Sequence, residues 1–278
     1  MLTVLEYASA SVLVFQPIHT TKKTLKMTGW DTNMKSHTQI IMGMPVILQL
    51  PDKTPQRLID DVFGRLVEID QRYSTYISTS EVSKIRGGDI DISKASEELL
   101  GILDLAEFAK KQTNGYFDVF HEGEFDPSGI VKGWAIAQAA AILDRAEIDD
   151  FLFEIAGDMR SSGYFELGLP WKVGIRAPFE PSKIVKVLSI SGACIATSGT
   201  SERGQHIYDP LHGGSIEDIL SISVVGPDIM WADIYATAAF AMGRSGIEWL
   251  EKVPDYDGFA ILPDMTGIST SGFSKYLA

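Results

Sequence analysis

The chain has 278 residues, of which 45% are hydrophobic and 22% are charged, and this balance predicts a folded globular protein with a substantial core. Its 24 Lys and Arg residues against 37 Asp and Glu residues give a net charge of -13, which would repel a nucleic acid backbone. We therefore expect no nucleic acid partner, and we expect a metal ion or helix N-termini beside any phosphorylated ligand.

The first part of the chain carries no strong targeting or core pattern. It lacks a basic start, includes Glu6 and is too short and polar for a spanning helix, so we expect a cytoplasmic protein without stable membrane insertion. Periodic core patterning begins near Thr38. Residues 1–37 are therefore predicted to form an N-terminal arm that need not be ordered, and residues 38–278 one functional domain. Cys194 is the only cysteine, which excludes an internal disulfide.

The first patterned segment is QIIMGMPVILQL, which begins at residue 39 and predicts two strands joined by a turn at Met42 and Gly43. Residues 54–69 follow, with apolar side chains at three- and four-residue spacing. They predict an amphipathic helix with Thr54 as its N-cap.

The next segment, STYISTSEVSKI, is rich in Ser and Thr and predicts an irregular loop. Residues 96–112 predict a second helix that is capped by Ser96 and ended by Asn114 and Gly115.

The second half alternates short apolar strands with helices. Predicted helices cover residues 130–143 and 230–242, and predicted strands cover residues 151–155, 171–175, 184–190, 219–225 and 258–262. Because no regular train of strand–helix–strand units appears, this order favours an α+β fold over a doubly wound sheet.

The segment FDPSGIVKGW at residues 125–134 predicts a turn that leads straight into a helix. Small residues let the backbone approach a ligand, and the N–H groups of the first turn together with Lys132 would favour an anion. Most such turns, however, only cap a helix.

Two nearby segments, IATSGT at residues 195–200 and QHIYDP at residues 205–210, place hydroxyl groups in a predicted loop beside a histidine. Hydroxyl groups such as those of Thr197 and Ser198 can bind phosphate or ribose oxygens. His206 has the chemistry of an acid or base near neutral pH, although a loop histidine is more often simply solvated.

The segment ADIYATA at residues 232–238 lies in a predicted apolar helix. Asp233 and Thr237 are four residues apart, so their oxygens lie on one helix face, as two ligands of a hard cation should. The alternative is a capping Asp and a core Thr bonded to its own helix.

Asp158 follows an apolar predicted strand directly after Ala156 and Gly157. A carboxylate at a strand end can accept hydrogen bonds from a ribose or a purine amine. It can equally be an ordinary turn residue, and the residues alone leave both interpretations open.

Together and in this order, these segments resemble the ApbE flavin transferase family. The family's motifs are matched by GMP at residues 43–45, STY at 74–76, TNGYFD at 113–118, DPSGIVKG at 126–133, AGD at 156–158, ATSG at 196–199, HIYDP at 206–210 and ADIYATA at 232–238. The resemblance implies an α+β fold in which two intimately packed α/β lobes with mixed sheets form one functional unit.

The resemblance also implies the composition of the site. Asp233, Thr237 and the backbone carbonyl of Gly129 would ligate Mg²⁺ at the FAD pyrophosphate, and Lys132 and His206 would act near that group. Tyr76 would stack on the isoalloxazine ring, and Asp158 would bind the adenosine end. The remaining implied flavin or phosphate contacts are Met44, Asp118, Thr197 and Ser198.

The implied activity is Mg²⁺-dependent transfer of FMN from FAD to a Ser or Thr of an acceptor flavoprotein, with release of AMP. Two alternatives stay open. One is an FAD pyrophosphatase that uses water as the nucleophile, suggested by a segment between Ser198 and His206 that is short for the family. The other is a flavin-binding protein without catalysis.

Overall fold

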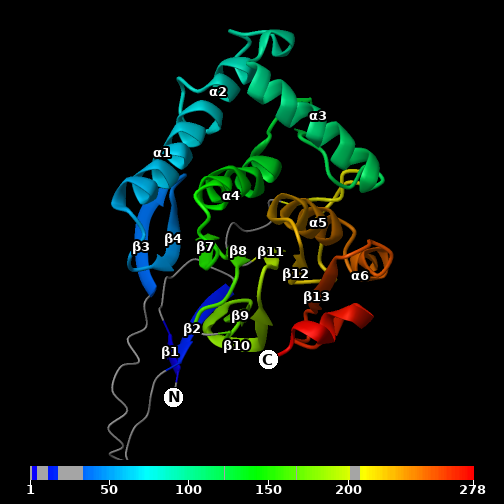
Figure 1. Cartoon of the computed structure of the whole chain (residues 1–278). Coiled ribbons are helices and arrows are strands. Elements are labelled where there is room, and N and C mark those ends of the chain that lie inside the picture. Colours follow the sequence, from blue (N-terminus) through cyan, green and yellow to red (C-terminus); the bar gives the residue numbers. More distant parts are fainter. Residues whose placement is uncertain (1, 5–11, 18–33, 122, 167, 201–206) are drawn as a thin grey trace, which may run out of the picture.

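The computed structural model describes residues 2–4, 12–17, 34–121, 123–166, 168–200 and 207–278. Among these, eight strands form a main antiparallel sheet, which Figure 1 shows beneath a layer of helices. In spatial order they are β14 (Gly267–Ser269), β13 (Asp257–Ile261), β12 (Ser221–Gly226), β11 (Cys194–Gly199), β8 (Asp158–Ser162), β7 (Phe151–Ile155), β4 (Met44–Pro51) and β3 (Met34–Ile41).

A smaller sheet packs on the other side of the main sheet. It consists of β1 (Leu2–Val4), β2 (Val12–Pro17), β9 (Trp171–Ala177) and β10 (Glu180–Ile190). The hairpin of β5 (Phe120–His121) and β6 (Glu124–Phe125) stands apart from both. All pairings between the described strands are antiparallel, so the α+β class is confirmed but the expectation of mixed sheets is wrong for this part of the chain.

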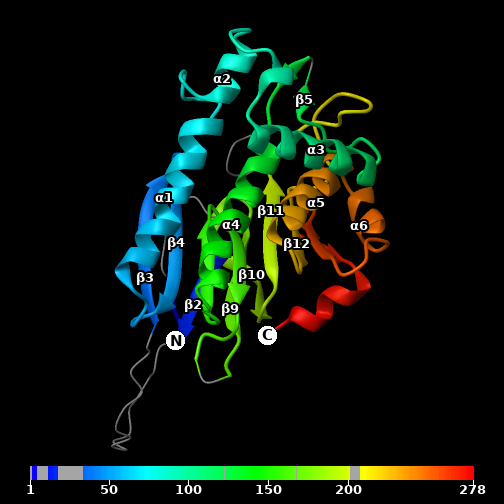
Figure 2. The ribbon, with the colours of Figure 1, turned by 45° about the horizontal axis from the view of Figure 1, so that its top comes forward.

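The helices cover the opposite face of the main sheet. They are α1 (Gln56–Tyr73), α2 (Glu81–Arg86), α3 (Glu97–Gln112), α4 (Ser128–Arg145), α5 (Ile229–Ala241) and α6 (Ser245–Leu250), with the short 3-10 helix η1 (Ile92–Lys94). A second 3-10 helix, η2 (Ser271–Tyr276), packs instead against the core between the two sheets. Figure 2 shows α4 between α1 and α5, and α4 contacts both of these helices. None of the described helices is both long and apolar enough to cross a membrane.

Alternation along the strands produces two separate cores. In β7, Phe151 and Phe153 belong to the large cluster beneath the helices, whereas Leu152 belongs to the smaller cluster between the sheets. The side-chain period of two sends successive residues to opposite faces, so an apolar strand such as FLFEI can serve both cores. The buried Trp171 of β9 fills the smaller cluster from the other sheet.

Most of the predicted elements are confirmed. The strands β3 and β4 are joined at Met42 and Gly43, whose positive φ angles of 56° and 69° form the expected tight turn. Ser96 caps α3 by accepting the Leu99 N–H at 3.4 Å, and Asn114 and Gly115 follow that helix with positive φ. Both features were readable because turn and cap residues act locally.

Three local predictions are wrong. Thr54 does not cap α1; the helix is preceded by Pro55, which makes no side-chain cap bond. The predicted loop after α1 contains α2, which Ser80 caps by accepting the Ser83 N–H at 2.9 Å. Residues 197–199, expected in a loop, lie inside β11, because all three residues pair with Ser221–Ser223 of β12.

The predicted N-terminal arm contributes described structure. Its strands β1 and β2 join the smaller sheet through pairing of β2 with β9, and β3 begins at Met34. The division of the chain at residue 37 stays a prediction.

Candidate functional site

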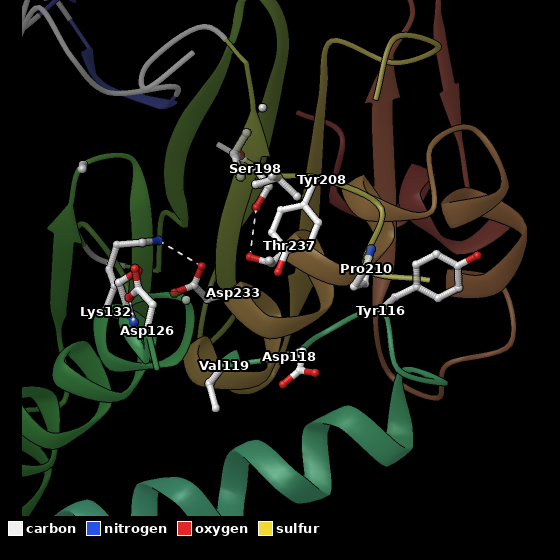
Figure 3. Close-up of a pocket in the computed structure, with 16 residues that line it drawn as sticks. Tyr116, Asp118, Val119, Asp126, Lys132, Ser198, Tyr208, Pro210, Asp233 and Thr237 are labelled. Atoms are coloured by element: carbon white, nitrogen blue, oxygen red, sulfur yellow. Dashed lines mark hydrogen bonds and ion pairs between the residues drawn. The ribbon is translucent and has the colours of Figure 1, made fainter. Parts of the chain in front are cut away.

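A pocket of about 250 Å³ lies where the first turns of α4 meet α5 and the end of β11 (Figure 3). The predicted site residues that line it are Asp118, Gly129, Lys132, Thr197, Ser198, Asp233 and Thr237. Segments more than a hundred residues apart in the sequence therefore converge on one cavity.

The N-terminus of α4 opens into this pocket. Pro127 precedes the helix without a side-chain cap, and Ser128 and Gly129 line the cavity. The Asp126 carboxylate accepts the Ser128 N–H at 2.9 Å and holds the entering turn. The Ile130 and Val131 N–H groups both donate to the Pro127 carbonyl at 3.0 Å. The Gly129 N–H and the positive end of the helix dipole therefore favour an anion at this place.

Helices α4 and α5 approach closely because Gly133 has no side chain. A Cβ at this position would lie 2.9 Å from both the Asp233 Cβ and the Met230 Cα. The close approach allows the Gly133 N–H to donate to the Asp233 Oδ2 at 3.0 Å. The glycine thus brings a buried carboxylate of one helix against the backbone of the other.

Lys132 connects two buried carboxylates. Its Nζ lies 3.0 Å from the Asp233 Oδ1 and forms an ion pair with the Asp158 Oδ2 (Figure 3 shows the former contact). Asp233 is 4% exposed and Asp158 is 1% exposed, so both charges need compensation within the protein. The Asp158 Oδ1 also accepts the Thr197 N–H at 3.0 Å. The structure therefore places Asp158 in the same cluster as Asp233.

Hydroxyl groups complete this wall of the pocket. The Thr237 and Ser198 hydroxyls lie 3.3 Å apart, and Thr197 shares a 2.7 Å hydrogen bond with Ser223 of β12. Thr237 projects from α5 one turn after Asp233, on the same face of the helix. Hydroxyls of this kind can donate to or accept from a ligand without adding charge.

The donor set fits a hard divalent cation. Asp233 and Thr237 provide a carboxylate and a hydroxyl, and Gly129 at the mouth of α4 can provide a backbone carbonyl. Within the described ranges, no group of three or more His, Cys, Asp and Glu residues could hold a metal by itself. A cation here would therefore need oxygens from a ligand as well, as Mg²⁺ at phosphate sites commonly does.

Asp118 lines another side of the pocket and is held from two directions. It pairs with Lys110 of α3 at 2.7 Å and accepts the Phe120 N–H at 3.0 Å. The hydrogen bond that Lys110 donates to Asp118 raises the pKa of Lys110 above its ordinary value. This pair fixes the loop between α3 and β5 beside the cavity.

Two predicted site residues that the structure describes, Met44 and Tyr76, do not line the pocket. Met44 lies at the start of β4 against the large core, and Tyr76 lies between α1 and α2 with 94% of its surface exposed. His206 lies outside the described residues. Their assigned roles stay predictions.

Several lining residues were not predicted as site residues: Tyr116, Asp126, Ile207, Tyr208 and Pro210. A usable signal existed for Asp126, which stands two residues before a helix that was itself predicted to seat an anion. Tyr208 and Pro210 belong to the HIYDP motif at residues 206–210. No local pattern in that motif indicates which side chains face a cavity.

Asp209 lies between Tyr208 and Pro210, and its side chain points into its own loop, where it binds Leu211 and His212. Burial alone would raise the pKa of Asp209, but hydrogen bonds from the His212 side chain and from the Leu211 and His212 N–H groups lower it. The carboxylate thus stays charged and organises the turn that carries the pocket residues Tyr208 and Pro210.

Comparison with known proteins agrees with these features. The model of the ApbE family matches residues 42–123 and 120–260. An FAD:protein FMN transferase of Vibrio cholerae is 31% identical over 129 residues, which cover 43% of this chain and 39% of that protein. One of Haemophilus influenzae is 30% identical over 139 residues, covering 46% of this chain and 40% of that protein. The chain thus matches about two fifths of the length of these relatives.

Solved structures share the fold over a larger range. The flavin transferase ApbE of Vibrio cholerae superimposes with a TM-score of 0.75 at 22% identity, covering 88% of this chain and 99% of that one. An ApbE protein of Thermotoga maritima gives a TM-score of 0.76 at 19% identity, again covering 88% and 99% of the two chains. At these identities the likeness establishes the fold.

Proposed function

The chain belongs to the ApbE family, and we propose that it is an FAD:protein FMN transferase, which moves the FMN part of FAD to a Ser or Thr of an acceptor protein and releases AMP. Curated relatives carry that name. The family model matches residues 42–123 and 120–260, a range that includes the pocket residues. The proposal makes FAD a substrate and the acceptor a second, protein substrate.

One observation carries this proposal. The pocket combines a helix N-terminus, the Lys132 ammonium and an oxygen donor set suited to a hard cation. A pyrophosphate needs all three, because its oxygens are anionic and the surrounding protein has a net charge of -13. A neutral ligand would need none of them.

The transfer step balances as a displacement at phosphorus. The acceptor hydroxyl oxygen forms a bond to the FMN phosphorus, the bond from that phosphorus to the bridging oxygen breaks, and AMP leaves with the electron pair. The hydroxyl proton passes to a base. We assign this role to His206, on the family motif that contains it, and the assignment is separate from the geometry of the described residues.

The residues of the pocket have distinct parts in this scheme. Asp233, Thr237 and the Gly129 carbonyl would hold Mg²⁺, which when bound would polarise the phosphoryl oxygens and offset their charge. The α4 N-terminus would bind a phosphate, and the Ser198 and Thr197 hydroxyls would bind flavin or phosphate oxygens. Asp158 is buried against Lys132 and the Thr197 N–H, so it is better suited to orienting Lys132 than to contacting adenosine.

The test is a transfer assay with purified protein, FAD, Mg²⁺ and candidate acceptor flavoproteins. Flavin fluorescence on the acceptor in a denaturing gel, with AMP released in equal amount, is the expected result. A matched reaction with a chelator should give neither product. AMP release without any labelled acceptor would indicate a pyrophosphatase, and FAD that stays intact with Mg²⁺ would indicate a binding protein.

A further inference from the structure

The Lys132 ammonium is the positive charge that compensates the two buried carboxylates Asp158 and Asp233. It lies 3.0 Å from the Asp233 Oδ1 and is paired with the Asp158 Oδ2, between two carboxylates that are almost fully buried. Its own side chain is 20% exposed and lines the pocket. The ammonium is therefore reachable from the cavity. Of its two partners, Asp233 also lines the pocket, whereas Asp158 lies behind it.

Backbone donors hold the two carboxylates in place. The second oxygen of Asp233 accepts the Gly133 N–H, and the second oxygen of Asp158 accepts the Thr197 N–H, each at 3.0 Å. Both donors belong to regular elements, α4 and β11. The oxygens that face Lys132 are thus fixed, and the flexible partner in each pair is the lysine.

A divalent cation on Asp233 would conflict with this arrangement. Mg²⁺ binds a carboxylate oxygen at about 2.0–2.1 Å, which would put it within a few ångströms of the ammonium that now contacts the same oxygen. Two cations that close in a buried site repel strongly. Because the carboxylates are held by backbone, Lys132 is the group that must move.

We propose that Lys132 competes with the divalent cation for Asp233, leaves that carboxylate when the cation binds, and then pairs with Asp158 and the ligand phosphate. This inference rests on the cation site of the proposed function. It has a thermodynamic consequence: a phosphate ligand that accepts Lys132 favours cation binding, so FAD and the cation strengthen each other's binding by the same factor.

The test measures Mn²⁺ affinity by electron paramagnetic resonance, without FAD, for the wild type and Lys132→Met. Removing the competitor should tighten Mn²⁺ binding about tenfold, within the roughly 5- to 150-fold range typical of coupled sites. Lys275→Met is the matched control, because it removes a lysine that pairs with Asp257 at 2.8 Å away from the pocket. Its Mn²⁺ affinity should equal that of the wild type. Equal or weaker Mn²⁺ binding by Lys132→Met would overturn the inference.

A second measurement needs only the wild type. Crystals soaked with Mn²⁺ should show an anomalous peak at Asp233 and Thr237, with the Lys132 ammonium no longer in contact with the Asp233 carboxylate. A peak at Asp233 with the ammonium still in its present place would disprove the competition. The competition would also be disproved if Mn²⁺ were absent from Asp233 both in wild-type crystals and in crystals of Lys132→Met.

These results separate the inference from the proposed function. Competition can fail while the protein still transfers FMN in the presence of Mg²⁺, which leaves the enzyme assignment intact. Conversely, Mn²⁺ binding that tightens in Lys132→Met would support the competition even if no acceptor became labelled.

Discussion

Asp233 combines burial, a backbone hydrogen bond and an ion pair in one side chain. Its two oxygens are engaged by the Gly133 N–H and the Lys132 ammonium, and it is the carboxylate of the proposed cation site. Its single negative charge is therefore the feature on which the proposed chemistry depends.

Replacing this charge should abolish most of the activity. Asp233→Asn keeps the shape and can still accept the Gly133 N–H, but it removes the anionic ligand. We expect FMN transfer to fall by a factor on the order of 100 or more, as for the loss of a main electrostatic contact in other active sites. The measurement is the rate of acceptor labelling at saturating FAD. Asp61→Asn, at an exposed position of α1, should retain the wild-type rate.

The lone cysteine gives a pH prediction. Burial raises the pKa of the Cys194 thiol from 9.0 to about 12. The thiol is therefore neutral in the folded state at a pH where it ionises in the unfolded chain, so its stabilising contribution is present below pH 9 and is lost as pH rises toward 12.

Urea unfolding at two pH values measures this effect. Between about pH 8 and about pH 10.5 the thiol should account for a loss of roughly 2 kcal/mol in the free energy of unfolding. Over the same pH range, the free energy of unfolding of Cys194→Ala should fall by roughly 2 kcal/mol less than that of the wild type. Identical pH dependence in the two proteins would contradict the raised pKa of the buried thiol.

At the scale of elements, the crossing of α4 and α5 decides whether the pocket forms. Gly133 permits the crossing, since a Cβ there would meet backbone and Cβ atoms of α5 at 2.9 Å. The first turns of α4 then carry Gly129 and Lys132 to the same cavity as Asp233 and Thr237.

Gly133→Ala should disturb both stability and activity. The added methyl group forces the helices apart, which should lower the free energy of unfolding by about 1–3 kcal/mol and reduce FMN transfer by displacing Asp233. Gly64→Ala in α1 is the matched control, because a Cβ there meets nothing within 4 Å. It should raise stability by up to about 1 kcal/mol with unchanged transfer. Denaturant unfolding and the labelling assay check the pair; full stability of Gly133→Ala would refute the packing argument.

At the scale of the whole molecule, the two cores have separate tasks. The large cluster lies beneath the helices that build the pocket, and the smaller cluster joins the two sheets on the far face. Damage to the smaller cluster should therefore affect stability without altering the chemistry.

Trp171→Ala tests this separation. Trp171 is fully buried in the smaller cluster, and its indole N–H donates to the Ser162 carbonyl at 3.0 Å. Truncation should lower the free energy of unfolding by about 3–5 kcal/mol. At low temperature, where the variant is still folded, FMN transfer should stay near the wild-type rate. Tyr164→Ala, 45% exposed, should change stability by no more than about 0.5 kcal/mol.

Local sequence features were sufficient for much of the fold. Helix α1 was predictable because its apolar side chains recur at helical spacing, and α3 because of its cap and end residues. Helices α4 and α5 were predictable because both are long runs rich in Ala and other apolar residues. The turn at Met42 and Gly43 was predictable because its chemistry is local. Residues 197–199 were misjudged because polar side chains within a central strand resemble a loop until the neighbouring strands are known.

The sequence by itself determined the α+β class, the helical placement of Asp233 and Thr237 on one face, and the order of motifs that marks the ApbE family. These are properties of residues close together in the chain or of their linear order. Only the tertiary structure decided that Lys132 bridges Asp158 and Asp233, and that Gly133 brings the two helices into contact. Such contacts join residues distant in sequence, and they depend on how helices and sheet pack rather than on any local preference.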